Sequence, residues 1–464
     1  MVSCMYGIFF VVLGNLSGNA IAFGIYVMNA AGYSDPTKGS VLGLAIGALS
    51  LTVLLHMVSR RAGIVINDIF AMLKVALLLV IIVLGFLKAR DSSTLGGQPN
   101  ATPNFDTATS FKPGAAEVPS VSNSLLYIIY TYSGFEQPFY VLAEIARPRK
   151  VFPRYTLLAM ALAITLFVLV NVAYLCAVPW DLPALHEQRN MATVFFGHVF
   201  SDATAATRAM DDLIALSIFG NLLVMTFTAP KVKQEIAKEG ILPWSLEFAT
   251  SHRTLMARLF PRRRRVSGVG HEYDGHATLE QSPMAALALH WLTSVMLIGL
   301  TAMLDPSIAY SVLVTLYSYV IIILNGFFTS FGLLYLKFSN SRRWANPNFH
   351  PTGGAVYAAI YFVACGFLLF AAFAPPSDGS PYSYAATHIT WFLLPLIGLS
   401  APTWGVAWYF GLRLMDIKRG TRLRVVRDPT TMPDEGVPGQ YIMTAEDITH
   451  RWEDIMTAED ITHR

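Results

Sequence analysis

The stretch Tyr130-Thr-Tyr-Ser-Gly134-Phe-Glu136-Gln-Pro138 interrupts an apolar segment that covers about residues 123–146. Glycine and proline four residues apart weaken a helix there, because Pro138 has no N–H to donate to the carbonyl of Gly134 and its ring crowds that turn. A carboxylate, Glu136, lies between the two. The stretch therefore predicts a helix that breaks near an acidic side chain.

The composition of the whole chain explains why such a segment matters. Of the 464 residues, 54% are hydrophobic and only 14% are charged, whereas a soluble domain carries about 25% charged residues. So few charges could not solvate the surface of a globule of this size. The composition excludes a soluble enzyme, a disordered scaffold and a disulfide-rich secreted domain, since the three cysteines lie in or beside apolar stretches. It indicates a polytopic membrane protein.

Ten segments are long and apolar enough to cross a bilayer as helices. They lie at about 5–30, 39–58, 65–88, 123–146, 155–178, 210–229, 284–304, 307–335, 355–374 and 390–411. We therefore expect an all-α polytopic membrane protein. Residues 1–411 form the predicted transmembrane domain, with an outer loop at 89–122 and an inner loop at 230–283, and residues 412–464 form a tail.

Lysine and arginine predict the orientation, because basic loops stay on the cytoplasmic side. With cytoplasmic termini, 26 of the 33 basic residues fall on the inner side, six on the outer side, and Lys74 inside a span. The outer loop 89–122 then carries a glycosylation sequon, Asn100-Ala-Thr102. We expect an integral protein of the plasma membrane with both termini in the cytoplasm.

Two ionisable groups lie deep in the predicted spans. Glu136 is at a depth where a carboxylate is costly and usually marks function, and transporters build substrate sites from broken helices at the midplane. The alternative for Glu136 is a simple proline kink with a hydrogen bond to a neighbouring helix. Lys74 lies mid-segment and is expected to face the bundle interior and a polar partner. His56 and His290 are interpreted as packing residues rather than proton relays.

Small residues spaced by four allow helices to approach closely. Gly14 and Gly18 have this spacing, as do Gly43 and Gly47. We interpret both pairs as sites of tight helix packing. Asn15 and Asn19, on the first of these helices, are either interhelical hydrogen-bond partners or cavity-lining groups.

No pattern typical of a soluble enzyme is present: the sequence lacks H-E-x-x-H, a P-loop and G-x-S-x-G. The cysteines are too scattered for a metal site. The basic run Arg262–Arg265 in the inner loop is interpreted as a topology signal or a contact for anionic lipid, so no nucleic acid partner is expected. The chain is predicted not to be an enzyme and to need no cofactor, with proton coupling through Glu136 left open.

The order of spans and motifs resembles the amino acid–polyamine–organocation superfamily. The stretch 132–153, from Tyr132-Ser-Gly-Phe-Glu through Glu144-Ile-Ala-Arg-Pro148 to Pro153, resembles that family's sixth helix and the loop after it. Residues 236–244, Ile-Ala-Lys-Glu-Gly-Ile-Leu-Pro-Trp, resemble the loop after the eighth helix, and Lys74 fits a lysine of the fifth. Within the superfamily the chain looks most like the L-type transporters and the fungal methionine and neutral amino acid permeases.

This resemblance implies a LeuT-type inverted-repeat bundle of twelve helices, of which the ten spans would be helices three to twelve. It also implies transport of amino acids, neutral and methionine-like, by alternating access. The unwound middle of the sixth helix would bind the substrate amino group through backbone carbonyls. The residues that it places at the substrate are Tyr130 as a gating aromatic, Thr131, Ser133, Gly134, Glu136, Phe219 and Asn221. Lys74 would take the place of sodium in sodium-coupled relatives.

Two features depart from the family pattern. Glu136 stands where L-type members carry a polar amide. Nothing in the chain matches the glycine-rich break of the family's first helix, so we expect that the chain lacks the first two helices. The alternative functions are therefore a non-transporting nutrient sensor or a truncated, inactive permease fragment. The partners expected are the amino acid substrate and the lipid bilayer, with any protein partner left open.

The tail contains a repeat. The decapeptide Ile442–Arg451 recurs unchanged as Ile455–Arg464. It is interpreted either as an acidic helical arm that binds protein or as a duplication with no part in transport.

Overall fold

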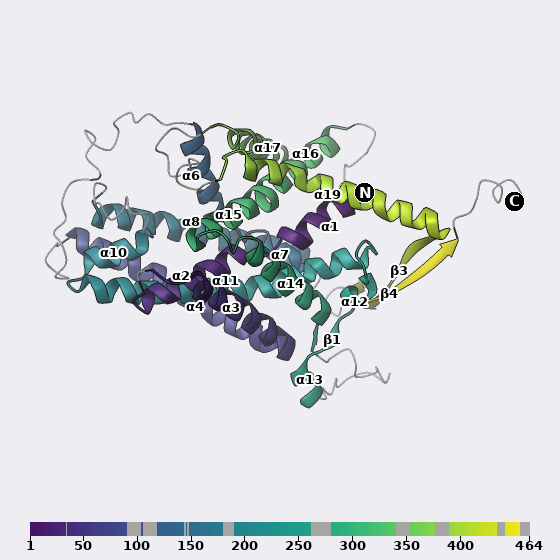
Figure 1. The fold of residues 1–464 in the computed structure, drawn as a ribbon, viewed down its shortest axis with the longest axis horizontal. Helices are drawn as coiled ribbons and strands as arrows, with labels where there is room; N and C mark the ends of the chain where they lie inside the picture. The colour runs from purple at the N-terminus through teal and green to yellow at the C-terminus, as the bar shows by residue number, and fades with distance from the viewer. Residues whose placement is uncertain are drawn as a thin grey trace, which may run out of the picture.

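The computed structural model (Figure 1) is a bundle of long helices with a short β-hairpin at one end. The residues that it describes are 1–33, 35–90, 104, 118–142, 145, 148–179, 190–260, 280–339, 353–375, 389–433 and 441–454.

In the described residues up to the end of the longest helix there are nine helices. They are α1 (Val2–Leu13), α2 (Ser17–Ala30), α3 (Lys38–Val58), α4 (Arg60–Arg90), α6 (Val118–Thr131), α7 (Gln137–Tyr140), α8 (Pro148–Ala177), α10 (Met191–Val199) and α11 (Ala203–Lys238). The second half contains α12 (Ser245–Ala249), α13 (Leu255–Leu259), α14 (Met284–Leu300), α15 (Pro306–Tyr317), the π-helix η3 (Ser318–Leu324), α16 (Asn325–Phe338), α17 (Gly354–Ala371) and α19 (Leu393–Arg419).

All ten predicted spans are helical in the structure. Eight helical stretches of the described part are long and apolar enough to cross a membrane, and α14 is a shorter apolar helix. The one predicted span still to be accounted for is the fourth in chain order, at 123–146, and it consists of α6 and α7 with a turn between them. The prediction of a polytopic helical membrane protein is confirmed.

Two of the spans are broken in the middle. The first predicted span, 5–30, is interrupted between α1 and α2 at Gly14-Asn15-Leu16, a break that the sequence analysis did not predict. The fourth is interrupted at 132–136, as the glycine and proline of that stretch predict. Both breaks lie beside the same region of α15, because α2 packs against α15 and Tyr317 at the end of α15 contacts Glu136.

The longest helix, α11, organises the interior. It packs against α2, α3, α4, α10 and α14. A large apolar cluster joins α1, α2, α3, α15 and η3 to the middle of α11, and a smaller one joins α4, α8 and α10 to its first turns. By contrast, α4 and α8 expose long apolar side chains, such as Met72 at 75% and Leu157 at 71%. These faces are those that a bilayer would cover.

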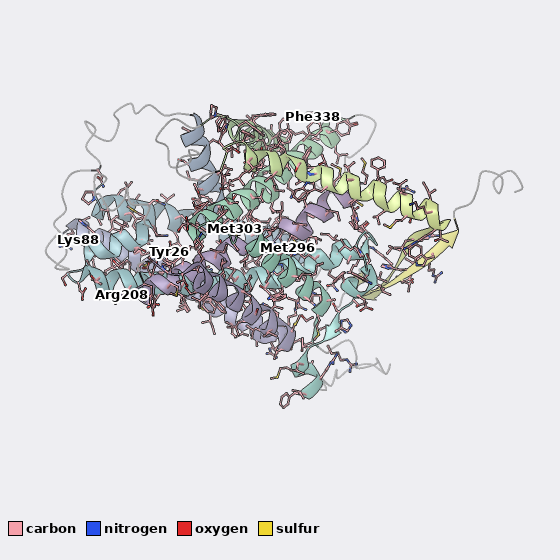
Figure 2. All side chains as sticks on the ribbon, viewed as in Figure 1. Tyr26, Lys88, Arg208, Met296, Met303 and Phe338 are labelled. Atoms are coloured by element: carbon pink, nitrogen blue, oxygen red, sulfur yellow. The ribbon has the colours of Figure 1, made fainter. Side chains whose placement is uncertain are left out.

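The groups predicted to be outer and inner lie at opposite ends of the bundle. In Figure 2, Lys88 and Arg208, both predicted to be outer, lie at one end of the bundle. The hairpin of the predicted inner tail lies at the opposite end (Figure 1). The helices therefore place the predicted outer and inner groups at opposite ends.

The hairpin corrects one interpretation of the tail. Strands β3 (Thr421–Pro433) and β4 (Tyr441–Asp454) pair antiparallel, so the first copy of the decapeptide is a strand and the helical arm is wrong. The side chains of Leu423 and Val425 both lie against Gly240, which follows α11. Residues two apart share a face in a strand but not in a helix, so this contact fits a strand. The second copy lies outside the described residues. Between α12 and α14, a smaller sheet pairs β1 (His252–Arg253) with β2 (Gln281–Ser282).

The small residues divide into two groups. Gly18 lies against Val314 of α15, where an added Cβ would be 3.1 Å from a methyl carbon, so this part of the packing prediction holds. At Gly43 and Gly47, an added Cβ meets nothing within 4 Å among the described residues. The close approach predicted at those two positions is absent from the described part of the structure.

We predict that Gly85→Leu destabilises the bundle, whereas Gly47→Leu does not. A Cβ at Gly85 would come within 2.5 Å of the Cβ of Ala173, so α4 and α8 would have to separate. Overpacking of this kind costs about 1–3 kcal/mol. The melting temperature of each purified variant in detergent, followed by tryptophan fluorescence, measures this loss of stability. Equal melting temperatures for the two variants would contradict the packing of α4 on α8.

Candidate functional site

The candidate site begins where α6 ends. Residues 132–136 form a turn, and Gly134 has a φ of 108°, which favours glycine. Among the backbone hydrogen bonds of the described residues outside the regular helices, none has the carbonyl oxygen of Thr131, Tyr132 or Ser133 as its acceptor. Free carbonyls in a membrane segment occur where they are buried in protein or line a cavity. The break therefore supplies acceptors for a ligand.

Glu136 is held by three neutral donors. Its Oε2 accepts from the backbone N–H of Gly134 at 2.9 Å. Its Oε1 accepts from the side-chain amide of Gln137 at 3.1 Å and from the hydroxyl of Tyr317 at 3.2 Å. In the described part of the chain, no lysine, arginine or histidine forms an ion pair with it. The carboxylate is thus hydrogen-bonded but lacks a counter-charge there.

Tyr317 connects the two broken helices. It is 5% exposed and is the last residue of α15, directly before the π-helix η3. Its ring lies edge-on to that of Tyr130, with 6.4 Å between centroids. Tyr130 in turn donates its hydroxyl to the side-chain oxygen of Asn19 on α2. Short π-helical segments are frequent at functional sites, and this one orients the tyrosine that holds Glu136.

The break between α1 and α2 borders a small cavity. Asn15 stabilises the break, because its amide donates to the carbonyl of Val12 at 2.8 Å and its oxygen accepts from the backbone of Ser17 at 3.1 Å. The cavity beside it has a volume of about 10 Å³ and is lined by Leu13, Asn15, Ser17, Gly18, Leu297, Leu313, Leu316 and Tyr317. That volume holds about one water molecule. This cavity is too small for an amino acid, and in that sense the conformation is called closed below.

The turn is also tied to α11. Gln137, at the start of α7, accepts a hydrogen bond from the hydroxyl of Thr228 on α11. Because Gln137 also donates to Glu136, a movement of α11 would be transmitted to the carboxylate through one side chain.

Lys74 forms a second polar group. Its ammonium donates to the side-chain oxygen of Asn221 on α11, so the predicted polar partner exists. The ring of Phe219 lies 5.7 Å from that of Phe70 on α4 and 5.9 Å from that of Phe23 on α2. No hydrogen bond among the described residues joins this group to Glu136. The structure therefore gathers the predicted residues into two groups, not one.

The remaining predicted residues lie as follows. Thr131 is exposed and its hydroxyl donates to the carbonyl of Tyr127 in its own helix at 2.9 Å, so its side chain does not join Glu136. Ser133 is half-buried in the turn. Asn100 lies outside the described residues. Within the described part, no three histidine, cysteine, aspartate or glutamate side chains are arranged to hold a metal ion.

Comparison with known proteins identifies the family. The model of the amino acid permease family matches residues 1–400. The chain belongs to the amino acid permease family. The predicted resemblance is therefore confirmed, and the similar proteins are permeases and transporters, not enzymes.

Three relatives illustrate the similarity of this family member. It is 26% identical to the high-affinity methionine permease of Saccharomyces cerevisiae over 391 residues, which are 82% of this chain and 60% of the relative. It is 24% identical to the low-affinity methionine permease of the same yeast over 54% of this chain and 44% of the relative. It is 28% identical to the human large neutral amino acids transporter small subunit 2 over 45% of this chain and 37% of the relative. The chain thus spans at most 60% of the length of these relatives.

Three site residues escaped the sequence analysis: Tyr317, Gln137 and Thr228. A tyrosine at the end of an apolar segment has no sequence signal that distinguishes it from a packing aromatic. Gln137 stands next to the predicted glutamate and could have been included on that ground. Asn19 was given two interpretations, and its bond to Tyr130 supports the interhelical one.

We predict that Asn221→Leu lowers the melting temperature of this family member, and that the double variant Asn221→Leu/Lys74→Met recovers most of the loss. The single change leaves an ammonium in the bundle without an acceptor, which costs about 3–5 kcal/mol, whereas removing both polar groups leaves an apolar contact. A double-mutant cycle of melting temperatures measures the coupling. Additive losses would show that Lys74 and Asn221 do not interact.

Proposed function

We propose that this permease family member is a secondary transporter that moves amino acids, neutral and methionine-like, across the membrane by alternating access. The observation that carries the proposal is the Glu136 carboxylate at a helix break with no ion-pair partner among the described residues. Its hydrogen bond from Tyr317 on another helix also fits the proline-kink alternative, so the uptake experiment below decides between the two.

The chemistry of the break suits a zwitterion. The free carbonyls of residues 131–133 and the carboxylate of Glu136 are acceptors that would bind an ammonium group. Tyr130, which contacts Asn19 and Tyr317, would cover such a group. The relatives named for methionine and for large neutral amino acids support a neutral side chain in the substrate.

Alternating access would act through the contacts of the turn. The closed cavity beside Tyr317 must widen before an amino acid can enter, because it holds about one water molecule. Among the described residues, hydrogen bonds of Glu136, Gln137 and Tyr130 join the turn and the end of α6 to α15, α11 and α2. Breaking them would let α6 and α7 move against the rest of the bundle, as broken helices do in transporters.

We predict that Glu136→Gln changes methionine uptake and flattens its pH dependence. Glutamine keeps the size of the side chain but cannot bind a proton or balance an ammonium. The loss of a charge-assisted hydrogen bond is worth about 1.5–3 kcal/mol, which is roughly 10- to 150-fold in affinity. Uptake of radiolabelled methionine into proteoliposomes between pH 5 and 8 measures it.

Glu247→Gln is the matched control, because Glu247 is an exposed carboxylate on α12. An unchanged affinity and pH profile for Glu136→Gln would remove Glu136 from the mechanism. Methionine binding to the detergent-solubilised protein without any uptake would favour the alternative, a sensor that binds without transporting.

We also propose a plasma membrane location with both termini in the cytoplasm. The distribution of lysine and arginine supports it, as does the separation of Lys88 and Arg208 from the hairpin in Figure 2. This orientation predicts a glycan at Asn100. In a eukaryotic host, wild-type protein should gain mobility on gels after treatment with peptide N-glycosidase, and Asn100→Gln should already have the faster mobility. A wild-type protein made at the cell surface without a glycan would contradict an outer loop at 89–122.

A further inference from the structure

A second ionisable cluster lies on α11, apart from the break. Lys233 is 0% exposed, and its ammonium donates to the hydroxyl of Thr293 on α14 at 2.8 Å. His290, one turn earlier on α14, is 1% exposed and close enough to Lys233 for an electrostatic interaction. Among the described residues, the Nδ1 of His290 has no hydrogen-bond partner, and no carboxylate forms an ion pair with Lys233.

This arrangement does not suit a permanent charge. A lysine side chain has three donors and here meets one neutral acceptor in the described part of the chain. A buried ammonium without a counter-charge costs several kcal/mol, and a second basic group beside it raises that cost. Burial beside one neutral acceptor and a basic side chain therefore favours the neutral amine in the closed conformation, whereas entry of water between α11 and α14 would allow it to bind a proton.

The other titratable groups on elements around α11 have partners of their own. Lys74 on α4 donates to Asn221, and His56 on α3 contacts the carbonyl of Leu223 at 3.1 Å. On α10 and the outer part of α11, Thr193 donates to Asp211 at 2.9 Å. The remaining titratable side chains on packed elements are Cys4 and Tyr6 on α1, Tyr26 on α2, Lys38 on α3, Arg60, Arg61, Asp68, Lys88 and Arg90 on α4, Tyr140 on α7, His198 on α10, and Glu247 on α12, and the charged neighbours of Lys233 on α11 itself are Lys231 and Glu235. His290 is the group that faces Lys233.

The cluster also has a structural connection to the helix breaks. Ser294, next to Thr293, accepts a hydrogen bond from the hydroxyl of Ser17 through its backbone carbonyl at 3.1 Å. Ser17 begins α2 and lines the cavity that Tyr317 shares. A movement of α2 at the break would therefore pull on α14 next to Thr293 and change the burial of Lys233.

We propose that Lys233, with Thr293 and His290, is a proton-binding site that is empty in the closed conformation and is filled when the end of the bundle nearer the hairpin opens to water. The amine nitrogen takes one proton from water on opening and returns it on closing. The ligand is the proton alone. The site rests on the proposed transport function, since opening and closing are its conformational steps.

The first test does not require transport. Melting temperatures of the detergent-solubilised full chain are measured at pH 7.5 and pH 9.5 for wild type, Lys233→Met and Lys238→Met. The opened and unfolded states bind a proton at Lys233 that the closed state excludes. Lower pH should therefore favour the opened and unfolded states and destabilise the closed state. The melting temperature of wild type should rise by about 3 °C more over this interval than that of Lys233→Met.

Lys238→Met is the matched control: Lys238 lies on the same helix and pairs with the half-exposed carboxylate of Glu235 at 2.6 Å. It should keep the wild-type pH dependence. If Lys233→Met does not fold, Lys233→Gln, which can still donate to Thr293, replaces it. The same pH dependence in wild type and in the folded Lys233 variant would overturn the proposal.

The second test uses methionine uptake into proteoliposomes at a fixed outer pH and a lumenal pH between 6 and 9. The rate of methionine uptake by wild type and by Lys238→Met should change with lumenal pH. For Lys233→Met this change in rate should be at least about fivefold smaller, while methionine exchange at symmetrical pH is kept. A lumenal pH response in Lys233→Met equal to that of wild type overturns the proton site. Absence of uptake by wild type, with the melting-temperature difference intact, instead overturns the transport function and leaves the proton site standing.

Discussion

The hydrogen bond from Tyr317 to Glu136 is the contact on which the arrangement of the site depends. A carboxylate inside a bundle of apolar helices must find donors within the protein, because lipid supplies none. One donor, the N–H of Gly134, is available only because the helix breaks and Gly134 adopts a positive φ. The second comes from the adjacent Gln137 and the third from α15. The break and the neighbouring helix therefore stabilise the same charge, and neither is sufficient without the other.

A break in a membrane helix leaves backbone groups without their helical hydrogen-bond partners. The structure has two such breaks in one region, and other groups lie beside the freed backbone at each. At 132–136 the freed backbone groups lie beside a buried tyrosine, and at Gly14-Asn15-Leu16 the side chain of Asn15 replaces lost backbone partners. The unbroken helix α11 contacts elements on both sides of this region, through Thr228 to α7 and through its packing on α2. The two interrupted segments, α1–α2 and α6–α7, can therefore move at their breaks while the continuous helix α11 keeps its position.

The sequence predicted the spans because apolar length is a strong signal, and it predicted the break at 132–136 because glycine and proline act locally. It also predicted a polar partner for Lys74, since an ammonium in a bilayer requires one. It did not predict the break at Asn15, where no proline interrupts the pattern and an asparagine side chain substitutes for the helix. Nor did it predict Tyr317, whose role depends on a π-helical turn and on a helix 181 residues away. The hairpin was missed because an acidic repeat has no period that separates strand from helix, and the docking surface at Gly240 decides between them.

The two buried lysines show how the same side chain can serve different purposes in one bundle. Lys74 meets the oxygen of Asn221, an amide whose strong dipole can hold an ammonium in place of a metal ion. Lys233 meets the hydroxyl of Thr293, which can also donate to the carbonyls of Leu289 and His290, and a second basic side chain stands beside it. The two lysines therefore differ in their acceptors and in the basic neighbour that stands beside Lys233. Both lysines are joined to α11, Lys74 through Asn221 and Lys233 as one of its own residues, so one continuous helix holds both ammonium-bearing side chains in the bundle.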